Sequence, residues 1–373
     1  MLYSLKANGL PALVREIAGR GFAAGAVSSG EIDLARRAGM APANMALEGI
    51  GKTDADLALA ARLAREGTPL LWVSLESVED AAAMAAAARA AGAPRMDVLV
   101  RVNPQVTPET HDWLAVGASD AKFGVRAEEL ATVIEAGGGA DGPLRWRGIH
   151  LHVGSQLGAI DAWRSSFRIG LRLLELQRAT LPDFDTLDAG GGFPVAMTEV
   201  DAVPGPARFA AEATAELELM PAAARPARLA IEPGRAVVAG CGWLIARVLH
   251  VRERDPRLVV LDAGMTELIR PALYGAVHPM SALTSLGTPV EAAQATEQAL
   301  VRIDGPICES TDRLGSAVVP PLERGDLVAI GIVGAYASSM AMTYNGRPRA
   351  AEVAWDGERL RTWRRRGPPS SLP

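Results

Sequence analysis

Short strand-like runs alternate with helix-like runs from the second residue onward, and this alternation constrains the fold more than any other feature. It is typical of a parallel sheet with helical crossovers. The count fits an eight-stranded (β/α)8 barrel, with a doubly wound open sheet as the competing interpretation. Helix-like segments include 11–20, 31–38, 54–66 and 77–91. The strand candidates are Leu2–Ala7, Gly25–Ser29, Met45–Gly49, Leu70–Leu75, Asp97–Asn103, Arg147–Val153, Thr186–Gly191 and Arg228–Pro233.

The side-chain pattern within these strands favours the barrel. Strands of a doubly wound sheet are apolar on both faces. In residues 147–153, however, Ile149 and Leu151 share one face and His150 and His152 share the other. A polar face near the C-terminal strand ends is where catalytic groups gather in a barrel. We therefore expect a (β/α)8 barrel over residues 1–235.

The pattern changes after Arg235. Alternating, β-branched runs follow at 236–251 and 258–262, and few helical stretches remain. Residues 236–373 are therefore expected to form a second, mostly β domain.

Composition excludes several classes of function. The net charge of −5 argues against a nucleic-acid or anionic-membrane partner. No apolar run approaches the roughly 18 residues of a membrane helix, and no export signal follows Met1. Two cysteines make neither a disulfide framework nor a Cys-rich metal site. The sequence predicts a cytoplasmic, globular protein with a small-molecule substrate and no metal.

Lysine is rare in this chain. Only Lys6, Lys52 and Lys122 occur among 38 basic residues, and a lysine amine can form a Schiff base whereas a guanidinium cannot. Lys6 ends the first predicted strand with its side chain expected to point inward, where burial would lower its pKa and make it a nucleophile. Lys52 is interpreted as a loop cation, and Lys122 as a residue that pairs with a ligand. Lys6 is thus the favoured covalent anchor.

Glycine-rich stretches follow the seventh and eighth predicted strands, at 188–194 and 232–235. Loops at these places in a barrel often bind phosphate, although tight turns are the simpler interpretation. Glu232 adds an inward-facing acid. Pyridoxal phosphate needs an amine for its aldehyde, donors for its phosphate and a carboxylate for its pyridine nitrogen. His152 would stack on its ring, the alternative being a hydrogen-bonded core histidine.

Seven short motifs occur in an order that resembles the fold-type III pyridoxal-phosphate-dependent decarboxylases, which share the alanine-racemase-type barrel. The resemblance runs from residue 2 to about 355. The motifs are Tyr3-Ser-Leu-Lys-Ala-Asn8, His152-Val-Gly-Ser-Gln156, Gly190-Gly-Gly-Phe-Pro194, Glu232-Pro-Gly-Arg235, Arg270-Pro-Ala-Leu-Tyr274, Cys308-Glu-Ser-Thr-Asp312 and Gly334-Ala-Tyr336.

The resemblance implies a role for each matching residue. Lys6 would hold pyridoxal phosphate as a Schiff base, His152 would stack on its ring and Glu232 would bind its pyridine nitrogen. The phosphate would be bound by Ser155, Gly191, Gly192, Gly234 and Arg235, with Tyr336 beside it.

Further roles concern the substrate and a second subunit. Arg270 and Tyr274, with Arg235, would hold the substrate's distal carboxylate. Cys308 and Glu309 would come from the partner in a homodimer. The Cys308 thiol would protonate the carbanion after CO2 leaves, and Glu309 would bind the distal ammonium.

The activity implied is the decarboxylation of meso-diaminopimelate to L-lysine and CO2, the last step of bacterial lysine synthesis. One alternative is a decarboxylase of the same family acting on D-ornithine, D-lysine or a carrier-bound glutamyl group. Another is a non-catalytic paralogue that binds pyridoxal phosphate. An amino-acid racemase and a Schiff-base aldolase fit the residues less well.

Two departures from the family pattern stand out. Members usually carry some tens of residues before the lysine strand, whereas Met1 lies five residues before Lys6. We expect either a misassigned start or a second domain without its edge strand. Gly25 stands where the second strand commonly offers an acid. Its loss is expected to weaken the positioning of the ring modestly.

Overall fold

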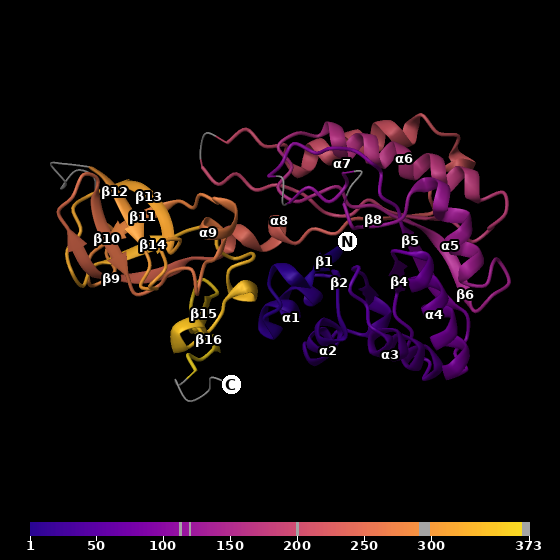
Figure 1. Cartoon of the computed structure of the whole chain (residues 1–373), viewed down its shortest axis with the longest axis horizontal. Helices are drawn as coiled ribbons and strands as arrows, with labels where there is room; N and C mark the ends of the chain where they lie inside the picture. Colours follow the sequence, from indigo (N-terminus) through magenta and orange to yellow (C-terminus); the bar gives the residue numbers. More distant parts are fainter. Residues whose placement is uncertain (112–113, 119–120, 199–200, 291–298, 368–373) are drawn as a thin grey trace. The chain divides into compact units, whose positions relative to one another are not determined.

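The computed structural model describes residues 1–111, 114–118, 121–198, 201–290 and 299–367. The chain forms two compact units (Figure 1). One comprises Met1–Val195 and Ala202–Val237; the other comprises Val238–Pro373 and the short segment Ala196–Asp201. In the described ranges, no helix is long and apolar enough to cross a membrane.

The first unit is an eight-stranded parallel barrel whose strands follow one another in sequence order. This order confirms the (β/α)8 fold, because the order of the strands in a doubly wound sheet reverses at its centre. Two hydrogen bonds join the end strands, from Leu2 N–H to the Ile231 carbonyl and from Ser4 N–H to the Pro233 carbonyl. The strands are β1 (Leu2–Ser4), β2 (Ala23–Ala26), β3 (Met45–Leu47), β4 (Trp72–Leu75), β5 (Met96–Arg101), β6 (Leu144–His150), β7 (Thr186–Asp188) and β8 (Arg228–Ala230).

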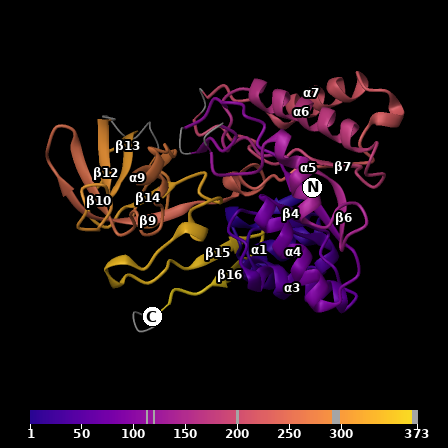
Figure 2. The same cartoon turned by 45° about the vertical axis from the view of Figure 1, so that its right-hand side comes forward.

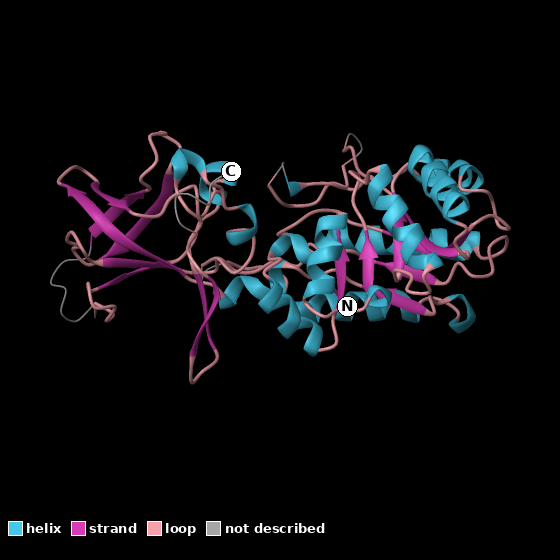
Figure 3. Ribbon diagram, turned by 90° about the horizontal axis from the view of Figure 1, so that it is seen from below, coloured by secondary structure: helices cyan, strands magenta, loops and turns pink. Residues whose placement is uncertain are grey.

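Helices cover the outside of the strands (Figure 3). Their ends carry local sequence signals. At the start of α3, Thr53 and Asp56 form a reciprocal capping box, and α4 ends at Gly92 in the left-handed conformation that glycine adopts readily. The helices are α1 (Pro11–Gly19), α2 (Ser29–Arg37), α3 (Asp54–Arg65), α4 (Val78–Ala91), α5 (Leu130–Ala136), α6 (Asp161–Gln177), α7 (Pro206–Glu218) and α8 (Arg235–Val238).

The barrel interior has an apolar layer and a polar layer. Near the strand starts, Trp72 of β4 packs with Leu2, Ala46, Leu99 and Ala230. Burying each large apolar side chain of this layer contributes about 1.5–3 kcal/mol. Nearer the C-terminal strand ends, the buried side chains are polar: Ser4, Glu48, Ser74, His150, Asp188 and Glu232. The apolar layer stabilises the barrel, and the polar layer faces the end where barrel active sites lie.

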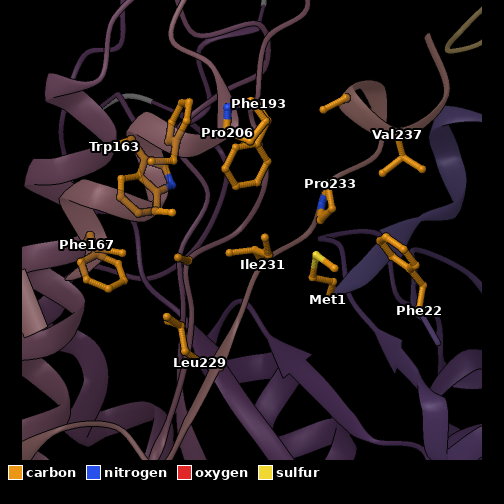
Figure 4. A pocket seen from close by; sticks show the side chains of 15 residues that line it. Met1, Phe22, Trp163, Phe167, Phe193, Pro206, Leu229, Ile231, Pro233 and Val237 are labelled. Atoms are coloured by element: carbon orange, nitrogen blue, oxygen red, sulfur yellow. The ribbon is translucent and has the colours of Figure 1, made fainter. Parts of the chain in front are cut away.

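The outer face of β8 borders an apolar cavity of about 470 Å³ (Figure 4). Leu229 and Ile231 line it from the β8 segment, and Trp163 and Phe209 line it from α6 and α7. Helix α8, with four residues, is too short to cover its strand as longer barrel helices do. Among the described residues that line this cavity, none has a charged side chain.

The second unit is mostly β, as expected (Figure 3). Its six-stranded sheet has the order β11-β14-β9-β10-β12-β13, and β15 pairs with β16 as a separate hairpin (Figure 2). Short helix α9 (Arg270–Tyr274) follows β10. The strands are β9 (Leu244–Arg252), β10 (Arg257–Leu261), β11 (Met280–Leu283), β12 (Ala299–Asp304), β13 (Arg313–Val319), β14 (Leu327–Ile330), β15 (Glu352–Trp355) and β16 (Leu360–Arg364).

Candidate active site

Glycines bring the loops at the barrel mouth into contact. A Cβ on Gly191 would lie 2.5 Å from the Glu232 carbonyl oxygen, and one on Gly234 would lie 3.0 Å from the Cβ atoms of Ser4 and Ala7. No larger residue fits either place without moving backbone. The loops after β7 and β8 therefore pack against each other and against the turn that carries Lys6.

His152, just after β6, is held by the glycine loop. The Gly191 N–H donates to Nδ1 of His152 over 3.0 Å, so a neutral ring carries its proton on Nε2. Burial, and then the charges of Lys6 and Arg101, lower the pKa of His152 well below its usual 6.5. A neutral, fixed imidazole face is suited to stacking on an aromatic ring.

Glu232 is a buried carboxylate that stays ionised. Nε2 of His150 lies 3.0 Å from its Oε1, and the Ser74 hydroxyl lies 2.6 Å from Nδ1 of the same histidine. Burial opposes ionisation, but the neighbouring His150 and the charge of Lys6 outweigh it and hold the pKa of Glu232 below 4.5. A buried anion of this kind can keep a pyridine nitrogen protonated.

Two further buried carboxyls, Glu48 and Asp188, were missed by the sequence analysis as site residues. Each has an oxygen within 4.8 Å of the other and of Glu232. Burial, and then the neighbouring acids, raise the pKa of Glu48 well above 4.5; burial, and then Glu232, raise that of Asp188 well above 3.8. Both shifts favour the protonated, uncharged form of these carboxyls. Glu48 lies two positions after Ala46, which faces the barrel interior, so the two side chains point to the same side. The same alternation indicated that Glu232 faces inward.

The structure corrects one expectation about Lys6. The strand β1 ends at Ser4, and Lys6 lies in a turn of 3-10 helix (Leu5–Ala7) with an exposed side chain, so the argument from burial does not apply to it. The expected inward direction assumed that the strand continued to Lys6, and the alternation of side chains along a strand no longer applies once the turn begins at Leu5. The charge of Lys6 nevertheless acts on Glu232 and His152. The amine thus belongs electrostatically to the same cluster.

The other two lysines lie in other settings. The Lys52 side chain is 1% exposed and its Nζ lies 2.9 Å from an Asp80 carboxylate oxygen, so it forms a buried structural ion pair rather than a loop cation. Lys122 is exposed, with Nζ 5.3 Å from the centre of the Phe123 ring.

Donors for an anion converge at the loops after β6, β7 and β8. Nη2 of the buried Arg235 donates to the Ser155 hydroxyl over 3.0 Å. The backbone N–H groups of Gly192 and Gly234 have no acceptor within the described ranges. A guanidinium, a hydroxyl and glycine amides are the donors that bind a phosphate group, so the residues present fit pyridoxal phosphate.

The second unit contains a buried guanidinium, that of Arg270. Its carbon lies 5.7 Å from the ring centres of both Tyr274 and Tyr336. Burial lowers the pKa of Arg270, and the groups that oppose this shift are the two phenols rather than carboxylates. Its Nε has no hydrogen-bond partner among the residues described. A buried, unpaired guanidinium is prepared to bind an anion.

Cys308 and Glu309 are exposed on the loop after β12. Asp312 holds this loop, because its carboxylate oxygens accept from the N–H groups of Met265 and Ile307 over 2.6 Å. The Tyr344 hydroxyl donates to Glu309 over 2.7 Å. An ordered loop thus presents a thiol and a carboxylate to solvent.

Comparison with known proteins agrees with these features. Residues 1–239 match the family described as "Pyridoxal-dependent decarboxylase, pyridoxal binding domain". A diaminopimelate decarboxylase from Deinococcus radiodurans is 35% identical, over 100% of this chain and 88% of the relative. One from Aquifex aeolicus is 32% identical over 98% of this chain and 82% of the relative.

Solved structures give the same result. Diaminopimelate decarboxylase from Helicobacter pylori, complexed with L-lysine, matches with a TM-score of 0.89 and 30% identity, over 100% of this chain and 88% of that one. The enzyme from M. jannaschii, also with L-lysine, matches with a TM-score of 0.88 and 27% identity, over 100% of this chain and 83% of that one. The chain therefore belongs to the family of pyridoxal-dependent decarboxylases, among the diaminopimelate decarboxylases.

Proposed function

We propose that this protein binds pyridoxal phosphate and decarboxylates meso-diaminopimelate to L-lysine and CO2. The observation that carries the proposal is the barrel-mouth cluster, in which glycine loops bring together the turn that bears the Lys6 amine, the Glu232 carboxylate beside His150, and the His152 imidazole held by the Gly191 amide. These are the three groups that the aldehyde, pyridine nitrogen and ring face of the cofactor require.

Bound pyridoxal phosphate supplies a ring that accepts the electron pair left at Cα when CO2 departs. The chain's residues position that ring. Lys6 provides the covalent attachment, Glu232 holds a proton at the pyridine nitrogen, and His152 covers one face. The phosphate is bound by Ser155, Gly192, Gly234 and Arg235, with Tyr336 beside it; the Gly191 amide, expected from the sequence to bind the phosphate, holds His152 instead.

Arg270 supports a substrate with a distal carboxylate. An unpaired guanidinium in a buried setting gains most from an anion that it binds through paired hydrogen bonds. In the proposal, Arg270 binds this carboxylate with Tyr274 and Arg235. Diaminopimelate has both a distal carboxylate and a distal ammonium, whereas D-lysine and D-ornithine lack the carboxylate.

We further propose a homodimer in which the partner chain supplies a second Cys308 and Glu309. Glu309 binds the distal ammonium of the substrate, and the thiol of Cys308 delivers a proton to Cα after CO2 has left. The exposure of both side chains supports this role, because an exposed pair is accessible to a neighbouring subunit. The L-lysine bound to the Helicobacter pylori relative is the product that this reaction releases.

The test is CO2 release from a panel of amino acids by the purified protein with pyridoxal phosphate. The panel contains meso-diaminopimelate, LL-diaminopimelate, D-lysine, L-lysine, D-ornithine and a γ-linked glutamyl thioester. We expect CO2 from meso-diaminopimelate together with stoichiometric L-lysine. Activity confined to a member of the panel without a distal carboxylate would contradict the assignment of the substrate, and CO2 from none of them would contradict the reaction.

A further inference from the structure

Gly25 and Glu48 are adjacent on neighbouring barrel strands. Gly25 of β2 pairs with Ala46 of β3, and Glu48 follows β3 with its N–H donating to the Ala26 carbonyl over 2.7 Å. A Cβ built on Gly25 would lie 3.0 Å from Oε2 of Glu48. The Glu48 carboxyl therefore fills the space that a side chain at position 25 would enter.

This carboxyl is buried, with only 6% of the residue exposed, and it faces other acids. Its Oε1 has no ordinary hydrogen-bond donor in the described part of the chain, and the same holds for Oδ2 of Asp188. Three carboxylates this close cannot all be ionised without a large electrostatic cost. At least one must therefore carry a proton, which makes it a possible donor to another.

The surroundings decide which carboxyl stays charged. Glu232 is the one beside His150, with 3.0 Å between Nε2 and Oε1. Burial and the neighbouring acids also raise the pKa of Glu48, which favours a proton on Glu48 and the negative charge on Glu232. A carboxyl that donates to a carboxylate makes a short, strong and directional hydrogen bond.

We propose that Glu48 is a positioning residue: its carboxyl donates to Glu232 and fixes the orientation of that carboxylate toward the pyridine nitrogen of the cofactor. The inference rests on the proposed function, because the pyridine nitrogen belongs to pyridoxal phosphate. It also explains why glycine occupies position 25, because a side chain there would displace the Glu48 carboxyl. The acid that the second strand lacks is thus replaced by one from the third strand.

Three variants test the role of Glu48 as a donor. Glu48→Gln keeps the shape and an N–H donor, Glu48→Ala removes the donor, and Gly25→Asp combined with Glu48→Ala moves a carboxyl to the neighbouring strand. The readouts are the dissociation constant of pyridoxal phosphate added to the cofactor-free protein, the pH dependence of the bound cofactor's absorbance, and the unfolding temperature of the cofactor-free protein.

We expect Glu48→Gln to bind the cofactor within about twofold of the wild type and Glu48→Ala to bind about tenfold more weakly, the typical loss of a hydrogen bond to a charged group. The bound cofactor of Glu48→Ala should also lose its ring proton at a lower pH, because its anionic partner is no longer fixed. The double variant should recover most of the affinity. Such a pattern of loss and rescue would not follow from a purely structural role.

Two results separate the inference from the proposed function. A wild-type protein that binds no pyridoxal phosphate contradicts the proposed function itself. A wild type that binds it, beside a Glu48→Ala variant of equal affinity and unchanged absorbance, overturns only the role of Glu48. If Glu48→Ala does not fold, the Gln variant decides, because its weak binding would show that Glu48 does not act as a neutral donor.

Discussion

The amide of Gly191 donates a hydrogen bond to Nδ1 of His152 across 3.0 Å, which joins the loop after β7 to the end of β6. The bond depends on glycine at this position, because a Cβ would lie 2.5 Å from the Glu232 carbonyl oxygen and 3.4 Å from Cε1 of the imidazole. It fixes the ring that we assign to the cofactor's face and keeps Nδ1 free of a proton. A protonated His152 would lose this bond.

This relationship predicts how stability depends on pH. The pKa of His152 is well below 6.5 in the folded protein, so below pH 6.5 the unfolded chain binds a proton that the folded chain does not. The contribution of His152 to stability is therefore complete above pH 6.5 and decreases as the pH falls, by at most about 1.4 kcal/mol per pH unit. The His152→Phe variant lacks this dependence. Urea unfolding of both proteins between pH 5 and 8 should show the wild type losing stability relative to His152→Phe on acidification, whereas parallel curves would contradict the assignment.

Lys6 is predicted to be the residue that carries the cofactor. Borohydride reduction of the holoenzyme, followed by proteolysis and mass spectrometry, should locate the adduct on Lys6. Lys6→Ala should lower kcat by at least about a thousandfold. Lys122→Ala, which changes an exposed lysine, is the matched control and should keep full activity. An adduct on Lys52 or Lys122 would show that the wrong amine has been assigned.

Removal of the Arg270 guanidinium should weaken recognition of the distal carboxylate without weakening the fold. For Arg270→Leu, the KM for meso-diaminopimelate should rise roughly 10- to 100-fold, the range expected for a lost hydrogen bond to a charged group. The free energy of unfolding should stay the same or increase, because a buried guanidinium without a carboxylate partner is costly. Steady-state kinetics and urea unfolding measure the two effects. An unchanged KM would exclude Arg270 from the substrate site.

Cys308 should affect turnover rather than binding. Its side chain is exposed, so Cys308→Ala should leave the unfolding temperature unchanged while kcat falls roughly 100-fold, as expected when a proton donor is lost. A dimer with shared sites predicts complementation. Lys6→Ala and Cys308→Ala proteins, mixed and allowed to exchange subunits, should regain about a quarter of wild-type activity, since random exchange leaves one intact site in each mixed dimer. No recovery despite proven exchange would place both residues in one subunit.

The buried ion pair between Glu76 and Arg101 should contribute strongly to barrel stability. Nη1 of Arg101 lies 2.9 Å from Oε1 of Glu76, and Oε2 accepts from the Gly124 N–H over 3.2 Å. Glu76→Gln would leave a buried guanidinium without its anion, at a cost of about 3–5 kcal/mol in unfolding free energy. Arg37→Ala, which breaks an exposed pair with Asp33, is the control and should change it by less than about 1 kcal/mol. Equal losses of unfolding free energy in the two variants would contradict the expected difference between a buried and an exposed ion pair.

Much of the site was predictable because its signals are local. Inward and outward side chains alternate with a period of two along a strand, so the polar face of 147–153 marked the end of β6 from sequence alone. Glu232 and the two glycine-rich loops were predicted from equally local signals, since each lies at the C-terminal end of a strand candidate. The ends of the strands were less predictable: β1 stops at Ser4 rather than at Ala7, because a 3-10 turn begins at Leu5.

The amino-acid sequence by itself determined the order of strands and helices, the rarity of lysine and the places of the glycine loops, because these depend on neighbours along the chain. Only the tertiary structure decided that Glu48 faces Gly25 and Glu232, that Ser155 meets Arg235 across 80 positions, and that Lys6 is exposed. Burial and charge depend on groups that are distant in the chain, and the closure of the barrel is what brings those groups within a few ångströms of one another.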